Sequence, residues 1–352
     1  MSAVTMAEGD TDGVDFFTMG MFIIDEIEFL PPKPAAKDIL GGAGTYSAVG
    51  ARIFSPPPKS QTLGWVVDCG SDFPSELRET IAQWDTGCLM RETPHRLTTR
   101  GWNGYGENDF RAFRYTTPKL RLDHTCLEGK LLWSKSFHLI CSPIRCVDLV
   151  RNILVMRDQW PEPGKKPRPL FIWEPVPDLC TLEELENCKV ALKHVDVVSP
   201  NHSELGAFHA KTVDGAGHVD YRAVEALSKQ WTQWGIGPDG DGAVVVRAGK
   251  DGCYVRDKVV SKWIPAVHGS AEKVVDPTGG GNGFLGGFAV GLVRCGKVED
   301  AAIWGSIAAS FAIEQIGMPT LVKAANGETW NGVRVEQRLA EFRKRLDRYV
   351  QP

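Results

Sequence analysis

A glycine-rich junction at residues 276–288 constrains the fold of this chain more than any other segment. It reads DPTGGGNGFLGGF, follows the short apolar run 273–275, and opens an apolar-periodic segment. This is the pattern of a strand end, a glycine turn and a helix start. Because glycine has no Cβ, the N–H groups of Gly279, Gly280 and Gly281 lie unshielded at the positive end of the helix dipole. The junction predicts an α/β unit with an anion site, for which phosphate is the common ligand.

Polar residues beside the glycines favour a binding site over a plain flexible turn. Asp276, Thr278 and Asn282 border the bare backbone. With them, the junction resembles the C-terminal motif of the PfkB/ribokinase family of carbohydrate and nucleoside kinases, typically Asp-Thr-x-Gly-Ala-Gly-Asp, often with proline in second place. Here Gly280 replaces the alanine and Asn282 the final aspartate. That aspartate takes the proton from the attacking sugar hydroxyl in the family, and a carboxamide has no comparable basicity. The backbone anion hole does not depend on that side chain.

Composition and charge narrow the class of protein. The chain has 352 residues, 43% hydrophobic and 24% charged, which is ordinary for a soluble globular protein. A net charge of −4 argues against general affinity for nucleic acid or anionic membrane. No apolar stretch approaches the ~20 residues needed to cross a bilayer, and the polar N-terminus is neither a secretory signal nor a transit peptide. Nine scattered cysteines without a CxxC pair predict reduced thiols and a cytoplasmic protein.

Helical patterns alternate with short apolar strand patterns along most of the chain. Strands are expected at 14–24, 62–67, 170–173, 195–198, 243–247, 253–255 and 259–264, and helices at 46–54, 74–84, 182–193, 201–210, 221–234, 281–295, 298–316 and 330–349. Such alternation predicts a mostly parallel sheet covered on both faces. Residues 1–13 are expected to be disordered and residues 14–350 to form one domain, with a proline-broken loop at 31–38.

The resemblance covers residues 14–320 and implies a ribokinase-like three-layer α/β/α sandwich with a small β lid. The lid segments are expected around 20–38 and 86–122. Residues 86–122 alternate arginines with aromatics, which suggests small exposed strands. A lid over the sugar excludes water that would otherwise accept the phosphoryl group. A solvated strand pair remains the plainer alternative, and a single-stranded nucleic acid site is disfavoured by the acidic chain.

The N-terminal part carries the residues expected on the substrate side. Gly41 and Gly42 resemble the family's N-terminal motif, whose glycines let a sugar approach the backbone. Tyr46 stands where an asparagine usually binds sugar hydroxyls, so its ring would fill that space. Asp25 follows an apolar strand where family members often carry an aspartate that binds sugar hydroxyls. The alternatives are a plain loop-to-helix junction and a strand-end carboxylate facing water.

Two further elements resemble the nucleotide side of the family. Asn201 and Glu204 match its Asn-x-x-Glu element, in which the glutamate organises Mg²⁺ and its waters. The same spacing is a good helix-capping pattern by itself. Arg247, Gly249 and Gly252 resemble the strand and glycine turn beside the nucleotide, with arginine where many members have threonine. Arg247 could pair with phosphate or reach a carboxylate at the rim, and a simple hairpin turn is the alternative.

The resemblance implies an ATP- and Mg²⁺-dependent kinase of a sugar or nucleoside hydroxyl, with a monovalent cation as a further candidate. Within the family the chain resembles a fungal branch of the maintenance-of-killer type. Loss of a general base costs ~10²–10⁴-fold in rate, unless Asp276 substitutes through water. The alternative is an inactive nucleotide-binding pseudokinase with a regulatory or scaffolding role. In either case a homodimer or a protein partner is a further candidate. A third interpretation is that Asn282 is an engineered Asp→Asn substitution, made to trap a substrate complex.

The departures fall on the acceptor side, at Tyr46 and Asn282, while the matches persist on the phosphate side, where Thr278 is expected beside the nucleotide. The sequence therefore predicts that nucleotide binding is better retained than turnover.

Overall fold

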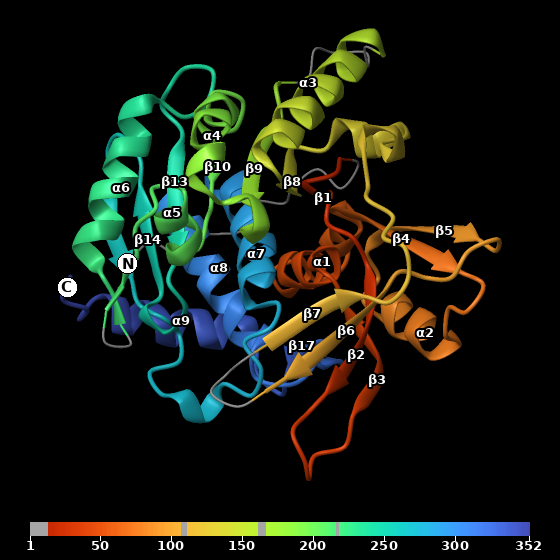
Figure 1. Ribbon diagram of the computed structural model, residues 1–352. Helices are drawn as coiled ribbons and strands as arrows, with labels where there is room; N and C mark the ends of the chain where they lie inside the picture. The colour runs from red at the N-terminus through yellow and green to blue at the C-terminus, as the bar shows by residue number, and fades with distance from the viewer. Residues whose placement is uncertain (1–12, 107–110, 161–166, 216–217) are drawn as a thin grey trace.

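A nine-stranded sheet forms the centre of the computed structural model, which describes residues 13–106, 111–160, 167–215 and 218–352 (Figure 1). The strand order is β15-β14-β13-β10-β9-β8-β1-β4-β5. Neighbouring strands are parallel except at β13–β14 and β14–β15, which confirms the mostly parallel sheet. The strands are β1 (Phe16–Thr18), β4 (Leu63–Gly70), β5 (Gly87–Thr93), β8 (Ser136–Cys141), β9 (Leu170–Pro175), β10 (Val197–Val198), β13 (Ala243–Arg247), β14 (Cys253–Arg256) and β15 (Ser261–Ile264).

Helices cover both faces of this sheet and enclose two apolar cores. One core lies between the sheet and α1, α2, α7, α8 and α9; the other lies between the sheet and α3 to α6. Within β4, Trp65 and Val67 face the first core and Val66 the second, as the pleat of a strand requires. The three-layer prediction is thus confirmed. The helices are α1 (Ala43–Ile53), α2 (Ser75–Gln83), α3 (Pro143–Gln159), α4 (Leu185–Leu192), α5 (His202–Ala207), α6 (Tyr221–Trp234), α7 (Gly280–Cys295), α8 (Val298–Ala312) and α9 (Val335–Leu346).

A second, four-stranded sheet lies apart from the central one in Figure 1. Its order is β3-β2-β6-β7, with β2 and β6 parallel and the other neighbours antiparallel. The single strand predicted over 14–24 is wrong: β1 belongs to the central sheet, and the chain crosses at Met19–Phe22 into the small one. The strands are β2 (Ile23–Glu28), β3 (Ala36–Gly41), β6 (Arg100–Tyr105) and β7 (Arg111–Tyr115).

Other departures from the predicted elements are local. Strand β5 arises from the expected lid segment 86–122 but pairs with β4 at the edge of the central sheet. Strand β8 and helix α3 were not predicted. A hairpin of β16 (Leu321–Ala324) and β17 (Gly327–Trp330) precedes α9, which therefore begins later than predicted. Residues 1–12, where disorder was predicted, lie outside the described residues, as do 107–110 of the expected lid.

Helix α7 packs very closely on α1. A Cβ on Gly286 of α7 would come within 1.9 Å of the Ser47 carbonyl oxygen of α1. Backbones approach this closely only where a side chain is missing. The packing brings the start of α7 beside the start of α1, so the two glycine motifs of the sequence meet in space.

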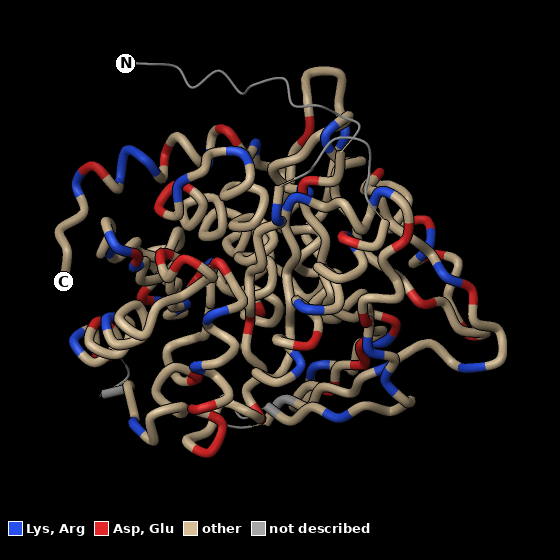
Figure 2. Tube along the Cα trace, turned by 90° about the horizontal axis from the view of Figure 1, so that it is seen from above, with Lys and Arg blue, Asp and Glu red and all other residues tan. Residues whose placement is uncertain are grey.

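The surface carries both signs of charge. Figure 2 shows lysine and arginine interspersed with aspartate and glutamate along the trace. All nine cysteines are free thiols. In the described ranges, no helix combines the length and the apolar character needed to cross a membrane.

Candidate active site

The start of α7 forms the centre of the site. Gly279 is the residue before the helix and has φ of +76°, in the left-handed region that favours glycine. A Cβ there would lie 2.2 Å from the Tyr46 ring. The strand expected just before the glycines is absent: Ala271–Lys273 form a 3₁₀ turn, and the N–H groups of Val275 and Asp276 donate to the Ile313 carbonyl oxygen instead. The helix-start prediction is correct, and its approach is a loop.

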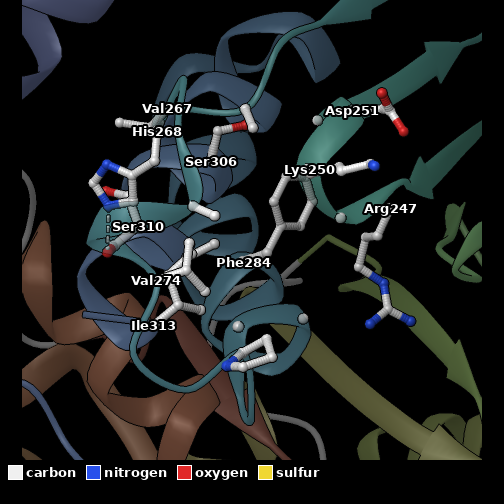
Figure 3. Close-up of a pocket in the computed structure, with 18 of the residues that line it drawn as sticks. Arg247, Lys250, Asp251, Val267, His268, Val274, Phe284, Ser306, Ser310 and Ile313 are labelled. Atoms are coloured by element: carbon white, nitrogen blue, oxygen red, sulfur yellow. Dashed lines mark hydrogen bonds between the residues drawn. The ribbon is translucent and has the colours of Figure 1, made fainter. Parts of the chain in front are cut away.

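A cavity of about 600 Å³ opens beside this helix start (Figure 3). Gly280 and Gly281 line it together with Arg247, and Gly249 and Gly252 lie on its wall. The remaining wall is largely apolar, from Val267, Val274, Phe284 and Ile313, with His268, Lys250 and Asp251 among the polar residues. A largely apolar cleft with a few convergent polar groups is typical of small-molecule sites. The glycine cradle therefore faces a cleft.

Arg247 is held between two buried carboxylates. Its Nη1 lies 2.8 Å from Glu174 Oε1, and its Nη2 lies 3.4 Å from Glu204 Oε2 and donates to the Ser199 carbonyl oxygen. Its Nη1 occupies the space of the missing Gly281 side chain, because a Cβ there would lie 2.2 Å away. Its Nε is buried and has no hydrogen-bond partner among the described residues. The sequence left phosphate and a carboxylate open as partners of Arg247, and in this structure Arg247 pairs with carboxylates.

Glu204 closes the capping box expected at the start of α5. Its backbone N–H donates to Asn201 Oδ1 at 2.8 Å, and its Oε2 accepts from the Asn201 N–H at 2.7 Å. Burial raises the pKa of Glu204 above its usual value, against the lowering effect of Arg247. The capping interpretation is therefore correct, and the proposed contact with magnesium waters would come in addition.

Asn282 projects from the first turn of α7 onto a polar network that sequence reasoning missed. Its Nδ2 donates to Glu174 Oε2 at 2.8 Å. The same oxygen lies 3.1 Å from His138 Nε2. On its other side, His138 Nδ1 lies 3.0 Å from Ser47 Oγ and 3.3 Å from Thr18 Oγ1. Since an ionised carboxylate only accepts hydrogen bonds, both Asn282 Nδ2 and His138 Nε2 donate to it.

The environment of Glu174 favours its ionised form. Burial raises the pKa of Glu174, but the charge of Arg247 and the hydrogen bonds of His138 and Asn282 outweigh burial and hold the pKa below its usual value. Glu174 is the penultimate residue of β9, and His138 lies in the neighbouring β8. A glutamate directly before a proline at a strand end was the one signal for it in the sequence.

The acceptor-side residues come together at the small sheet. Asp25 of β2 is 7% exposed, so the alternative of a strand-end carboxylate facing water does not hold. A Cβ on Gly41 would come 1.9 Å from its Oδ2, so Gly41 makes room for this carboxylate. Gly42 precedes α1 with φ of +86°. Burial raises the pKa of Asp25 to about 7, an Asn103 hydrogen bond lowers it, and the charge of Asp276 raises it.

Asp25 is expected to make the unliganded protein less stable as pH rises. Its folded-state pKa of about 7 lies above its ordinary pKa of 3.8, so its contribution to stability is full below pH 4 and is lost as pH rises through 7. The difference corresponds to at most about 4 kcal/mol. Urea unfolding of Asp25→Asn at pH 5 and pH 8 should show a gain over wild type at pH 8 that shrinks at pH 5. The exposed Asp239→Asn is the control, and a pH-independent Asp25→Asn effect would contradict the assignment.

The remaining predicted residues lie near the cradle. Asp276 Oδ1 accepts from the Thr278 N–H at 2.9 Å and so shapes the turn that precedes Gly279. Tyr46 is 5% exposed, and its ring packs on Gly279. Among the described residues, no three His, Cys, Asp or Glu side chains gather to hold a metal ion.

Known proteins resemble this chain over nearly its whole length. The profile described as pfkB family carbohydrate kinase matches residues 175–324. An uncharacterized protein of Schizosaccharomyces pombe is 38% identical over 345 residues, covering 94% of this chain and 92% of that protein. Protein MAK32 of Saccharomyces cerevisiae is 36% identical over 341 residues, covering 92% and 90%. The structure of ribokinase from Giardia lamblia superposes with a TM-score of 0.69 at 15% identity, covering 94% of this chain and 99% of that one.

Proposed function

Because this chain belongs to the pfkB family of carbohydrate kinases, in a branch with the two fungal proteins, we propose that it transfers the terminal phosphoryl group of ATP to a hydroxyl of a sugar or nucleoside. One observation carries the proposal: the bare backbone of Gly280 and Gly281, at the positive end of α7, faces a cavity of about 600 Å³. Backbone N–H groups aimed at developing negative charge are a major source of rate in acyl and phosphoryl transfer.

The residues present fit a nucleotide. A Cβ on Gly281 would collide with Arg247 Nη1, so the glycine leaves room for the positive charge of Arg247 at the same wall. The apolar wall around Phe284 and Ile313 suits a planar base, which has little polar surface on its faces. Bound Mg²⁺ supplies positive charge to the phosphates, and Glu204 would hold it through water. Lys250 and Asp251 offer polar contacts at the rim.

The acceptor would lie on the other side of the cradle, where Asp25 and Tyr46 meet the start of α7. Asp25 is buried, so its carboxyl can bind a hydroxyl in a site from which water is excluded. The Tyr46 ring covers Gly279 and narrows this side. We therefore propose a compact acceptor, with the small sheet of β2, β3, β6 and β7 as its cover.

A nucleotide-binding protein without transfer activity is the second candidate. Asn282 favours it, because a carboxamide stands where the family carries its base and its Nδ2 is already bound to Glu174. The same fold would then serve regulation or scaffolding. Binding and transfer must therefore be measured separately.

Calorimetry is expected to show Mg-ATP and Mg-ADP binding with a dissociation constant of ~1 mM or tighter, the usual range for enzyme substrates. AMP is the matched control: without the terminal phosphates it should bind at least about tenfold more weakly if the α7 cradle binds them. A transfer screen with ribose, fructose, myo-inositol and adenosine follows. Nucleotide binding without phosphate transfer would favour the second candidate. Equal affinities for AMP and ATP would show that the α7 cradle does not bind the terminal phosphates, which contradicts both candidate functions.

A further inference from the structure

Glu174 stands within hydrogen-bond distance of the position from which the family's base acts. Its Oε2 lies 2.8 Å from Asn282 Nδ2. Its side chain is 8% exposed, beside the cradle wall that Arg247 shares with Gly281. Helix α7 lacks a carboxylate at Asn282, but the carboxylate of Glu174 in β9 lies one hydrogen bond away from that position.

We propose that Glu174 is the proton acceptor for phosphoryl transfer, in place of the carboxylate that Asn282 lacks. The proposal rests on the phosphotransferase function above and identifies the residue that completes it. Asn282 becomes a positioning residue, which orients Glu174 on one side and the acceptor hydroxyl on the other.

The orientation of Asn282 supports this division of roles. Its Nδ2 must face Glu174, because only the amide nitrogen can donate to a carboxylate. Its Oδ1 is then directed away from Glu174 and has no hydrogen bond within the described residues. An oxygen acceptor that borders the cradle can receive the hydrogen bond of an acceptor hydroxyl before transfer. A carboxamide at position 282 can therefore donate a hydrogen bond to Glu174 and accept one from the acceptor hydroxyl at the same time.

Glu174 keeps room for one more hydrogen. A carboxylate has about four acceptor positions. Three are used: Oε1 accepts from Arg247, and Oε2 accepts from Asn282 and His138. The fourth lies on Oε1. The titratable and charged groups that face Glu174 are Arg247 from β13, His138 from β8 and Glu204 from α5.

Arg247 couples this carboxylate to the phosphate cradle. In the free protein its charge keeps Glu174 ionised, which a base requires. Its Nη1 also lies beside Gly281, at 2.2 Å from where a side chain would begin. Phosphate bound at the cradle would share the charge of Arg247 and so weaken its hold on Glu174. The proton affinity of Glu174 would then rise when a nucleotide is bound.

The step balances. The acceptor hydroxyl gives its proton to Glu174 Oε1 while its oxygen forms a bond to the terminal phosphorus of ATP. The bond from that phosphorus to the bridging oxygen breaks, and its electron pair leaves with ADP. The proton then passes from Glu174 to solvent as the products leave. Such transfer depends mostly on positioning and charge, so a carboxylate of low basicity suffices.

Glu174→Gln tests the assignment, with the carboxylate swap Glu174→Gln/Asn282→Asp as its partner. Glu174→Gln is expected to lower the rate of phosphate transfer ~10²–10⁴-fold, while the dissociation constant of Mg-ADP changes less than about threefold. The swap returns a carboxylate to α7 and should recover at least about tenfold of the lost rate. Glu328→Gln is the matched control: it removes a carboxylate that pairs with the buried Arg52, outside the cavity, and should leave transfer unchanged.

The outcomes separate this inference from the proposed function. Wild-type transfer that survives in Glu174→Gln, or a swap that recovers nothing, overturns the role of Glu174 and leaves the kinase. If the wild-type protein binds Mg-ADP but transfers phosphate neither to any of the four acceptors nor to water, both the role of Glu174 and the proposed kinase function are overturned. If Glu174→Gln fails to fold by circular dichroism, the swap decides: it keeps one carboxylate and one amide, and inactivity of a folded swap overturns the proposal.

Discussion

Asn282→Asp is expected to destabilise the protein at pH 8 by about 2–4 kcal/mol and not to restore a more active kinase. The new carboxylate would face Glu174, whose Oε2 lies 2.8 Å from the atom replaced. Two like charges at ~3 Å repel by about 5 kcal/mol at an effective dielectric constant of about 20, so one carboxyl becomes protonated. A pKa raised in the folded state costs stability as pH rises. Urea unfolding should therefore show a penalty that falls by at least half at pH 5.

Two variants control this result. The exposed Asn326→Asp makes the same chemical change on the surface and should alter stability by less than about 0.5 kcal/mol at either pH. Combining Asn282→Asp with Glu174→Gln removes the repulsion and should recover most of the loss. A single mutant as stable as wild type at pH 8 would mean that the two side chains are not in contact.

Gly279→Ala is expected to weaken Mg-ADP binding at least about 100-fold. Its φ of +76° is strained for alanine, and the Cβ would lie 2.2 Å from the buried Tyr46 ring, which has little room to move. The strain costs of order 1–3 kcal/mol by itself. Relief requires the turn before α7 to shift, and that turn positions the N–H groups of the cradle. Calorimetry measures the affinity, and thermal unfolding shows whether the fold persists.

Gly269→Ala is the matched control for this prediction. Gly269 lines the same cavity, has no positive φ, and a Cβ there would meet nothing within 4 Å. Its effect on Mg-ADP affinity is expected to stay within about threefold. Equal losses in both variants would show that cavity volume, and not the turn at Gly279, controls nucleotide binding.

Much of the fold followed from the sequence because the helix and strand periods of the core are strong. The helices at 221–234 and 281–295 begin and end within a residue of their predicted bounds. The run 14–24 failed for a physical reason: it is apolar throughout, and periodicity cannot show that its halves enter different sheets. The run 273–275 was expected to be a strand because of its two valines. In the structure the Val274 N–H donates to the Ala271 carbonyl oxygen and the Val275 N–H to that of Ile313, directly after α8, so neither joins a neighbouring strand.

The parts of the site that consist of backbone groups could be predicted from the sequence. The parts made by side chains that are distant in the sequence could not. Glycine runs mark Gly279 and Gly42, since each needs a positive φ. His138 has no local motif, and the one local signal for Glu174 is its place before Pro175 at a strand end. They matter only because β9 and β8 are neighbours and α7 starts above them, which is a property of the folded sheet. The role of Arg247 as the bridge between two carboxylates likewise required the tertiary structure.

The crossing from β1 to β2 ties the two sheets mechanically. Thr18, at the end of β1, lies 3.3 Å from His138, and Asp25 is the third residue of β2. The linker Met19–Phe22 spans at most about 14 Å when extended. If the small sheet covers the acceptor as proposed, a tilt that moves Asp25 by more than this linker can accommodate would also displace Thr18 beside His138. Movement of the cover would then be coupled to the hydrogen bonds of the buried histidine–glutamate pair.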